Sequence, residues 1–201
     1  MTRRLLPVGD RALLVECPDE DPTGVAAGVR AAALSGVVDV VPAAATVLVT
    51  VDRPDRLSGL TRHVLEVEAG PVTGAAEPVV LSVRYDGPDL EAVAAAAGLT
   101  PDQVVERHRQ GSYRVAFCGF APGFAYLEGL DPVLHLPRRS DPRTRVPAGS
   151  LAIAGPYTAV YPRATPGGWH LLGISAEVLW DPGSVPPTPL LPGTPVRFEV
   201  P

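Results

Sequence analysis

FCGFAPGFAYL at Phe117–Leu127 is the first of three loop segments with an unusual composition. The other two are PRRSDPRTRVPAGSLAIAG at Pro137–Gly155 and YPRATPGGWHLLG at Tyr161–Gly173. Glycine, proline, aromatic residues and arginine alternate in these three loop segments, where a plain scaffold would carry long apolar runs. Glycine lets the backbone approach a ligand closely, proline stiffens a loop, and arginine supplies planar charged donors for carboxylate or phosphate. The segments therefore indicate a preorganised surface for an anionic partner or substrate.

The residues around these segments predict a β-rich domain. Residues 120–201 contain 15 prolines and 9 glycines, a density that helices of ordinary length do not survive. Upstream, we expect a strand at Val79–Tyr85, a helix at Asp89–Ala97, and a second helix from the N-cap Thr100 to about Arg109. Short apolar runs then recur at the close spacing typical of a barrel or sandwich: Tyr113–Cys118, Leu151–Ala154, Ala159–Tyr161, His170–Ile174, Glu177–Trp180 and Val196–Val200.

The first third of the chain has a different pattern of apolar residues, which predicts a small α+β unit. Helical periodicity covers Pro22–Leu34 and Pro54–Val67, and the order of elements is ββαββα. The expected strands are Leu5–Val8, Ala12–Glu16, Val37–Val41 and Thr46–Val51. The unpatterned, Gly- and Pro-containing stretch Glu68–Pro78 is the expected linker, so the predicted domains are residues 1–74 and 75–201.

Composition excludes several classes of function. The net charge of −5 over 201 residues disfavours nonspecific nucleic-acid binding. All 17 basic residues are arginine, which excludes a Schiff-base lysine or a Walker-type phosphate lysine. Two cysteines are too few for a disulfide framework, and the four histidines show no metal-ligand spacing. We find no signal peptide and no apolar run of membrane-spanning length, so we expect a cytoplasmic protein without metal or membrane contact.

The basic residues gather in the loop segments. Between Val133 and Ala176 there are five arginines and one acid, a local charge of +4. Arg138 and Arg143 are the candidates for pairing with carboxylate or phosphoryl oxygens. The alternative for each is a salt bridge to Asp131, Asp141 or another acid.

Other residues of the loop segments suggest the rest of a site. The aromatic residues from Phe117 to Tyr126 build either core or a pocket wall, and Trp169 either stacks on a ligand or plugs a barrel. Gly167 and Gly168 can present backbone N–H groups to an anion, and Ser150 can donate a hydrogen bond. His108 and His170 are the candidates for proton transfer, although a lone helical histidine such as His108 also suits a structural role.

The same residues carry a family resemblance that spans nearly the whole chain. The chain resembles the allophanate hydrolase subunit 1 family, which includes the B subunit of bacterial 5-oxoprolinase, a Kip-type kinase inhibitor and part of the carboxyltransferase domain of urea carboxylase. The resemblance departs at Ile174, where the family usually has arginine. The matching motifs are Gly119-Phe120, Pro122-Gly123-Phe124, Tyr126-Leu127, Pro137-Arg138, Pro142-Arg143, Val146-Pro147-Ala148-Gly149-Ser150, Ile153-Ala154-Gly155, Tyr161-Pro162 and Pro166-Gly167-Gly168-Trp169.

The resemblance implies an α+β N-terminal domain followed by a cyclophilin-like β-barrel domain. It also implies ATP-dependent opening of the 5-oxoproline lactam to glutamate. The implied partners are an allophanate hydrolase subunit 2 protein (a homologue of the 5-oxoprolinase C subunit) and a homologue of the 5-oxoprolinase A subunit, with ATP and Mg in the assembled complex. The isolated chain is expected to be inactive. The alternatives are a module that inhibits a sensor histidine kinase, and allophanate or urea carboxyl-group chemistry.

The candidate site combines both lines of reasoning. We expect catalytic roles for His108, Arg138, Arg143 and His170. The expected contacts to a small anionic substrate come from Phe120, Pro122, Gly123, Tyr126, Arg145, Ser150, Tyr161, Gly167, Gly168 and Trp169.

Overall fold

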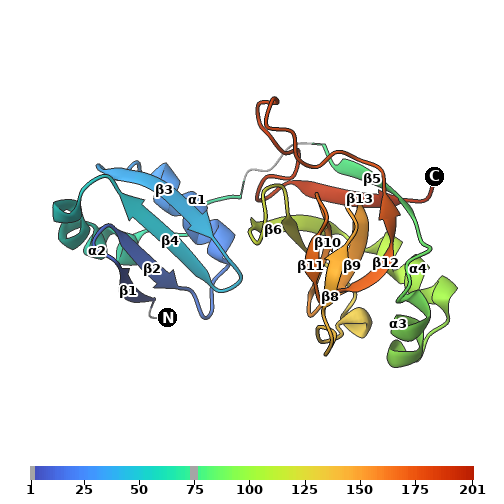
Figure 1. Cartoon of the computed structure of the whole chain (residues 1–201). Helices are drawn as coiled ribbons and strands as arrows, with labels where there is room; N and C mark the ends of the chain where they lie inside the picture. Colours follow the sequence, from blue (N-terminus) through green and yellow to red (C-terminus); the bar gives the residue numbers. More distant parts are fainter. Residues whose placement is uncertain (1–2, 73–76) are drawn as a thin grey trace. The chain divides into compact units, whose positions relative to one another are not determined.

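The structure, a computed structural model, describes residues 3–72 and 77–201 and divides into two compact units on either side of residues 73–76 (Figure 1). The predicted boundary between residues 74 and 75 lies outside the described residues. Among the described helices, none is long and apolar enough to cross a membrane.

The N-terminal unit is a four-stranded antiparallel sheet with two helices, in the predicted order of elements. The sheet order is β1-β2-β4-β3. The elements are β1 (Arg4–Val8), β2 (Ala12–Glu16), α1 (Pro22–Ala31), β3 (Val37–Pro42), β4 (Thr46–Val51), the 3₁₀ turn η1 (Pro54–Arg56) and α2 (Leu57–Glu66).

Both helices cover the same face of this sheet. Burial alternates along β4, where Val47, Val49 and Val51 are buried and the residues between them are half-buried. These valines share one core with Val25 of α1 and Val64 of α2. The strand period of two therefore places one apolar row against the helices, which is what the sequence pattern predicts.

The C-terminal unit is built on a closed seven-stranded barrel. Its strand order is β10-β7-β6-β13-β5-β12-β9, with β9 returning to β10. Only the β5–β13 pair is parallel among the barrel pairings of the described residues. The barrel strands are β5 (Val79–Arg84), β6 (Tyr113–Cys118), β7 (Ala125–Glu128), β9 (Ser150–Ala154), β10 (Tyr157–Val160), β12 (His170–Ser175) and β13 (Pro195–Glu199).

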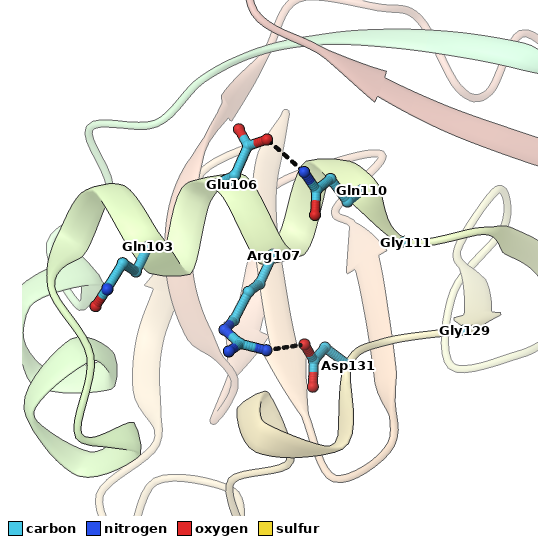
Figure 2. A pocket seen from close by; sticks show the side chains of 7 residues that line it. All are labelled: Gln103, Glu106, Arg107, Gln110, Gly111, Gly129 and Asp131. Atoms are coloured by element: carbon cyan, nitrogen blue, oxygen red, sulfur yellow. Dashed lines mark hydrogen bonds and ion pairs between the residues drawn. The ribbon is translucent and has the colours of Figure 1, made fainter.

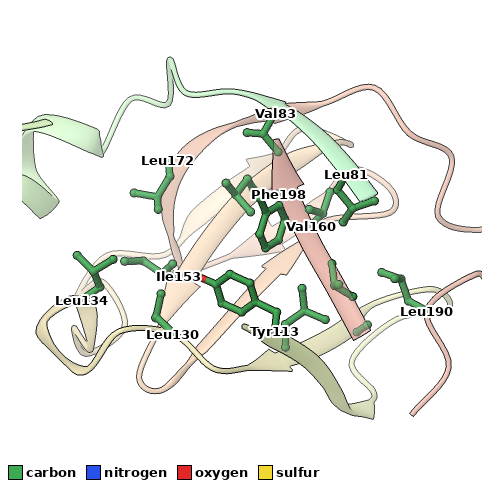
Figure 3. Packing of buried hydrophobic residues seen from close by; sticks show 14 of the residues in the cluster. Leu81, Val83, Tyr113, Leu130, Leu134, Ile153, Val160, Leu172, Leu190 and Phe198 are labelled. Atoms are coloured by element: carbon green, nitrogen blue, oxygen red, sulfur yellow. The ribbon is translucent and has the colours of Figure 1, made fainter. Parts of the chain in front are cut away.

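Large apolar side chains fill the inside of the barrel. Figure 3 shows Tyr113 and Phe198 in the middle of this core, with Leu81, Ile153 and Leu172 around them. Because these side chains come from strands far apart in the sequence, the core forms only when the barrel closes.

Two helices follow β5, and the second begins after the predicted N-cap, Thr100. They are α3 (Leu90–Ala97) and α4 (Pro101–Gln110). The Thr100 side chain accepts a hydrogen bond from the Gln103 N–H, and the Gln103 side chain accepts one from the Thr100 N–H. This capping box satisfies two amide donors that the first turn of α4 would otherwise leave unpaired.

The structure corrects the prediction in two places. Glu177–Trp180 is not a strand. Its burial alternates, with Leu179 buried and Val178 and Trp180 exposed, but it pairs with no strand among residues 3–72 and 77–201. Conversely, the loop segments contain strands that the prediction missed or shortened. Besides β7, these include the small two-stranded sheet of β8 (Arg143–Val146) and β11 (Thr165–Gly167).

Strand β9 connects the barrel core to the loop segments because all five of its residues are buried. Leu151 and Ile153 face the barrel core. Ala152 and Ala154 belong instead to a second core with Phe124, Tyr161 and Trp169. Since side chains alternate along a strand, this second core lies on the outer face of β9.

Candidate functional site

The loop segments meet on this outer face and form a small pocket of about 50 Å³. All five of its aromatic residues come from the first and third segments. The pocket is lined by Phe120, Phe124, Tyr126, Arg138, Tyr161, Gly167, Gly168 and Trp169. Seven of these eight residues belong to the predicted site, and Phe124 was predicted as core or pocket wall.

The aromatic rings of the pocket hold one another edge to face. Phe124 lies at their centre, with ring centroids 5.1 Å from Tyr126, 5.1 Å from Tyr161 and 5.6 Å from Trp169. The interplanar angles of these pairs run from 62° to 88°. Edge-to-face packing is the favourable arrangement of aromatic quadrupoles, so the rings stabilise one another in these positions.

Phe120 is the exposed one among the aromatic residues of the pocket. The residue is 61% exposed, and its backbone has φ of 67°, in the left-handed region that non-glycine residues rarely occupy. The surrounding turn is closed by hydrogen bonds from Gly119 N–H to Phe124 O and from Phe124 N–H to Ala121 O. A strained backbone that presents an apolar ring to solvent is a feature that often accompanies binding sites.

Arg138 gives the pocket its charge. It is exposed at the pocket wall, and its guanidinium acts on both pocket tyrosines. Burial raises the pKa of Tyr126 and of Tyr161, while the positive charge of Arg138 works in the opposite direction. Both phenols therefore remain protonated at neutral pH and can donate hydrogen bonds.

Arg143 does not line the pocket, but its backbone pairs with the pocket residue Gly167 and its charge acts on Tyr161. Its Nη2 donates to Asp89 Oδ1 at 2.7 Å, and Arg139 Nη1 donates to the same oxygen at 2.9 Å. Arg143 therefore makes a salt bridge to another acid, which is the alternative that the sequence left open. Arg138 and Arg143 look equivalent in sequence, each following a proline, but only Arg138 lines the pocket.

His108 is a buried core residue and not a proton-transfer group of this site. Its Nε2 donates to Thr158 Oγ1 at 2.9 Å, because the Thr158 hydroxyl itself donates to Ala152 O. Its Nδ1 then accepts from the Tyr85 hydroxyl at 2.8 Å. The side chain has no solvent exposure, and burial lowers the pKa of His108 to about 3. His108 therefore has a structural role, which is the alternative that its position in a helix suggested.

His170 lies beside the pocket without lining it. Its Nε2 is 2.9 Å from Pro137 O, and the geometry requires the imidazole to donate this bond. Pro137 directly precedes Arg138, so His170 fixes the arginine loop.

The remaining predicted contacts lie outside the pocket. Pro122 and Arg145 are exposed, and Ser150 is buried in β9. Gly123 has φ of +77°, and a Cβ there would come within 2.8 Å of Trp180 Cβ, so this glycine serves the turn. Ile174, where the family usually has arginine, is half-buried in β12 and pairs with Arg84 and Ser150.

Cys118 has a structural role as well. Its Sγ donates to Leu190 O at 3.2 Å, and burial raises the pKa of the thiol to about 11. The thiolate that a nucleophile needs is therefore scarce at neutral pH.

Asp89 is a residue that sequence reasoning missed. It stands one residue before α3, where an aspartate suggests an ordinary helix cap. In the structure its side chain is 5% exposed and binds Arg139, Arg143 and the Leu171 N–H, which are 50 to 82 residues away.

A larger hollow of about 490 Å³ lies elsewhere on the barrel unit, along α4 (Figure 2). Its charged groups are already paired: Arg107 Nη1 is 2.7 Å from Asp131 Oδ2, and Gln110 Nε2 donates to Glu106 Oε1. In the part of the chain that the structure describes, no group of three or more His, Cys, Asp or Glu side chains could hold a metal ion. The aromatic pocket with Arg138 is therefore the candidate site.

Known proteins support a family assignment. Residues 3–190 match the carboxyltransferase domain, subdomain C and D. The 5-oxoprolinase B subunit of Escherichia coli O157:H7 is 44% identical over 171 residues, which cover 82% of this chain and 78% of that protein. Its counterpart in Bacillus subtilis (strain 168) is 48% identical over 112 residues, covering 56% of this chain and 47% of that protein.

Solved structures share the fold. TTHA0988 matches with a TM-score of 0.80 and 38% identity, over 95% of this chain and 40% of that one. The Kluyveromyces lactis urea carboxylase matches with a TM-score of 0.72 over 98% of this chain and 22% of that one; at 19% identity this likeness concerns the fold alone. The resemblance carried by the loop segments is confirmed, and the chain belongs to the family of the carboxyltransferase domain, subdomain C and D.

Proposed function

We propose that this chain is the B-type subunit of a 5-oxoprolinase, and that its pocket binds 5-oxoproline during ATP-dependent opening of the lactam to glutamate. The observation that carries the proposal is the contact of one arginine, Arg138, with an aromatic pocket. 5-Oxoproline is a small flat ring with one carboxylate, which suits an apolar wall and a planar cation. The likeness to the Escherichia coli protein, over most of both chains, supports this substrate.

The chain's own residues would bind and orient the substrate. Arg138 would pair with the carboxylate, and the rings of Phe120 and Trp169 would hold the apolar side of the lactam. The protonated hydroxyls of Tyr126 and Tyr161 would donate toward the lactam oxygen as it gains charge. Donors preorganised in this way are worth on the order of 3 kcal/mol each in a desolvated site.

A second protein is needed to complete the site. The pocket of about 50 Å³ is far smaller than the roughly 300–1,000 Å³ of ordinary ligand sites. We therefore propose a cleft shared with a homologue of the 5-oxoprolinase C subunit, joined by a homologue of the A subunit in a cytoplasmic complex. The barrel of this chain, proposed to be cyclophilin-like, would supply one wall, and the isolated chain would be inactive.

We propose no ATP site in the aromatic pocket or in the hollow along α4. The aromatic pocket is too small for a nucleotide, and the hollow along α4 has two acids, Glu106 and Asp131, against one arginine. We therefore assign ATP and its Mg to the assembled complex, outside this pocket, and derive no step of the reaction through them.

Reconstitution tests the proposal. The chain is combined with homologues of the A and C subunits, ATP, Mg and 5-oxoproline, and glutamate is measured. Arg138→Gln is expected to raise the KM for 5-oxoproline about 10- to 100-fold, as for the loss of a hydrogen bond to a charged group. Arg163→Gln is the matched control, because Arg163 is exposed and does not line the pocket. An assembled, folded complex that forms no glutamate would refute the proposal.

A further inference from the structure

We infer that Asp89, at the start of α3, is a positioning residue that holds Arg138 against the aromatic pocket through the two neighbouring arginines. The inference rests on the proposed function, since it deepens the role of that pocket. Asp89 touches neither the pocket lining nor Arg138 in any described contact. It acts on the loop that carries Arg138.

Asp89 uses both carboxylate oxygens to tie three parts of the barrel unit together. Oδ1 accepts from Arg139 Nη1 at 2.9 Å and from Arg143 Nη2 at 2.7 Å. Oδ2 accepts from the Leu171 N–H at 2.7 Å, in β12. The loop from Arg139 to Arg143 is therefore fixed to the strand that follows the pocket residue Trp169.

Two further hydrogen bonds fix the backbone on each side of Arg138. The Arg139 N–H donates to Gly168 O at 2.8 Å. His170 Nε2 donates to Pro137 O at 2.9 Å. With its preceding carbonyl, its following amide and the next side chain all held, Arg138 has little freedom except in its own side chain.

Charge makes Asp89 the element on which this arrangement depends. Two guanidinium groups share one carboxylate whose side chain is only 5% exposed. Burial would raise the pKa of Asp89, but the hydrogen bonds from Arg143 and Leu171 and the charges of both arginines outweigh it, so the group stays ionised. Without the carboxylate, two part-buried cations would face each other and repel, which would push the loop away from β12.

The cluster also remains cationic after the pairing. Arg139 Nε and Arg143 Nη1 are buried and make no hydrogen bond within the described structure. The surplus positive charge lies in the same loop as Arg138, so it adds to the attraction of the pocket for a carboxylate.

The first test needs no ligand. In a Trp180→Phe background Trp169 is the sole tryptophan, and its quenching by acrylamide reports how closely the loop covers the pocket. Asp89→Asn is expected to raise the quenching constant at least twofold. Arg139→Gln is a milder variant that folds if Asp89→Asn does not, since the Arg143 and Leu171 bonds remain; it is expected to give a smaller rise. Asp141→Asn, an exposed acid of the same loop, is the matched control.

The second test uses the reconstituted complex and a double-mutant cycle. Asp89→Asn is expected to raise the KM for 5-oxoproline about 10- to 100-fold, while adding nothing in the Arg138→Gln background. Additive effects, or unchanged quenching in both Asp89→Asn and Arg139→Gln, would overturn the inference. If the wild-type complex forms no glutamate, the proposed function fails, and the quenching result still decides whether Asp89 positions the loop.

Discussion

Lowering the pH from 7 to 4.5 is expected to weaken the barrel unit through the single imidazole of His108. The ordinary pKa of histidine is 6.5, and burial lowers the pKa of His108 to about 3. Between these two values the unfolded chain binds a proton that the folded chain does not. The contribution of neutral, buried His108 to the free energy of unfolding is therefore present above pH 6.5 and is lost as the pH falls below that value.

The size of the effect follows from the pKa difference. Each pH unit below 6.5 lowers the free energy of unfolding by about 1.4 kcal/mol, so His108 alone accounts for about 2.5 kcal/mol between pH 7 and pH 4.5. His108→Gln removes this contribution. At pH 7 the variant is expected to be about 1–3 kcal/mol less stable, because the Tyr85 hydroxyl loses its Nδ1 acceptor.

Urea unfolding followed by tryptophan emission measures this difference. Both tryptophans, Trp169 and Trp180, lie in the barrel unit and report its unfolding. The wild-type free energy of unfolding should fall by about 2.5 kcal/mol more than that of His108→Gln over this pH range. His135→Gln, which removes an exposed histidine of the same unit, is the matched substitution for comparison. Equal slopes for wild type and His108→Gln would show that His108 is not the cause of the acid sensitivity.

Two further substitutions separate the scaffold from the site. Gly123→Ala places a Cβ 2.8 Å from Trp180 Cβ at a φ of +77°, so thermal unfolding should show a loss of about 1–3 kcal/mol. A melting curve like that of the wild type would contradict this. Phe120→Ala removes the ring of a residue that is 61% exposed, so stability should change by less than about 0.5 kcal/mol while the KM for 5-oxoproline rises in the reconstituted complex. An unchanged KM would remove Phe120 from the site.

Local signals explain which elements could be predicted from the sequence. The capping box of Thr100 and the alternating valines of β4 act within a few residues, so their pattern is visible in one stretch of chain. Glu177–Trp180 shows the limit of such patterns. Its apolar residues suit a strand, but a strand also needs a partner with free backbone groups, and no local signal reports that partner.

The candidate site also has features that depend on local sequence and features that depend on distant residues. Its rings and glycines are concentrated in three short segments, which is why most of the lining could be predicted. Which of Arg138 and Arg143 lines the pocket could not be predicted, because this depends on Asp89, 54 residues before Arg143. His108 could not be decided either, since its burial depends on Tyr85 and Thr158, which come from other parts of the chain.

The outer face of β9 and β10 explains how one sheet supports both the fold and the site. On the inner face, Leu151, Ile153 and Val160 fill the barrel. On the outer face stand Ala152, Ala154 and Ala159, whose small side chains leave room for the pocket rings to lie directly on the strands. Large side chains there would lift those rings off the sheet, and Arg138 would lose the wall against which it is held. The alternation of large and small residues along these strands is therefore a requirement of the pocket as much as of the barrel.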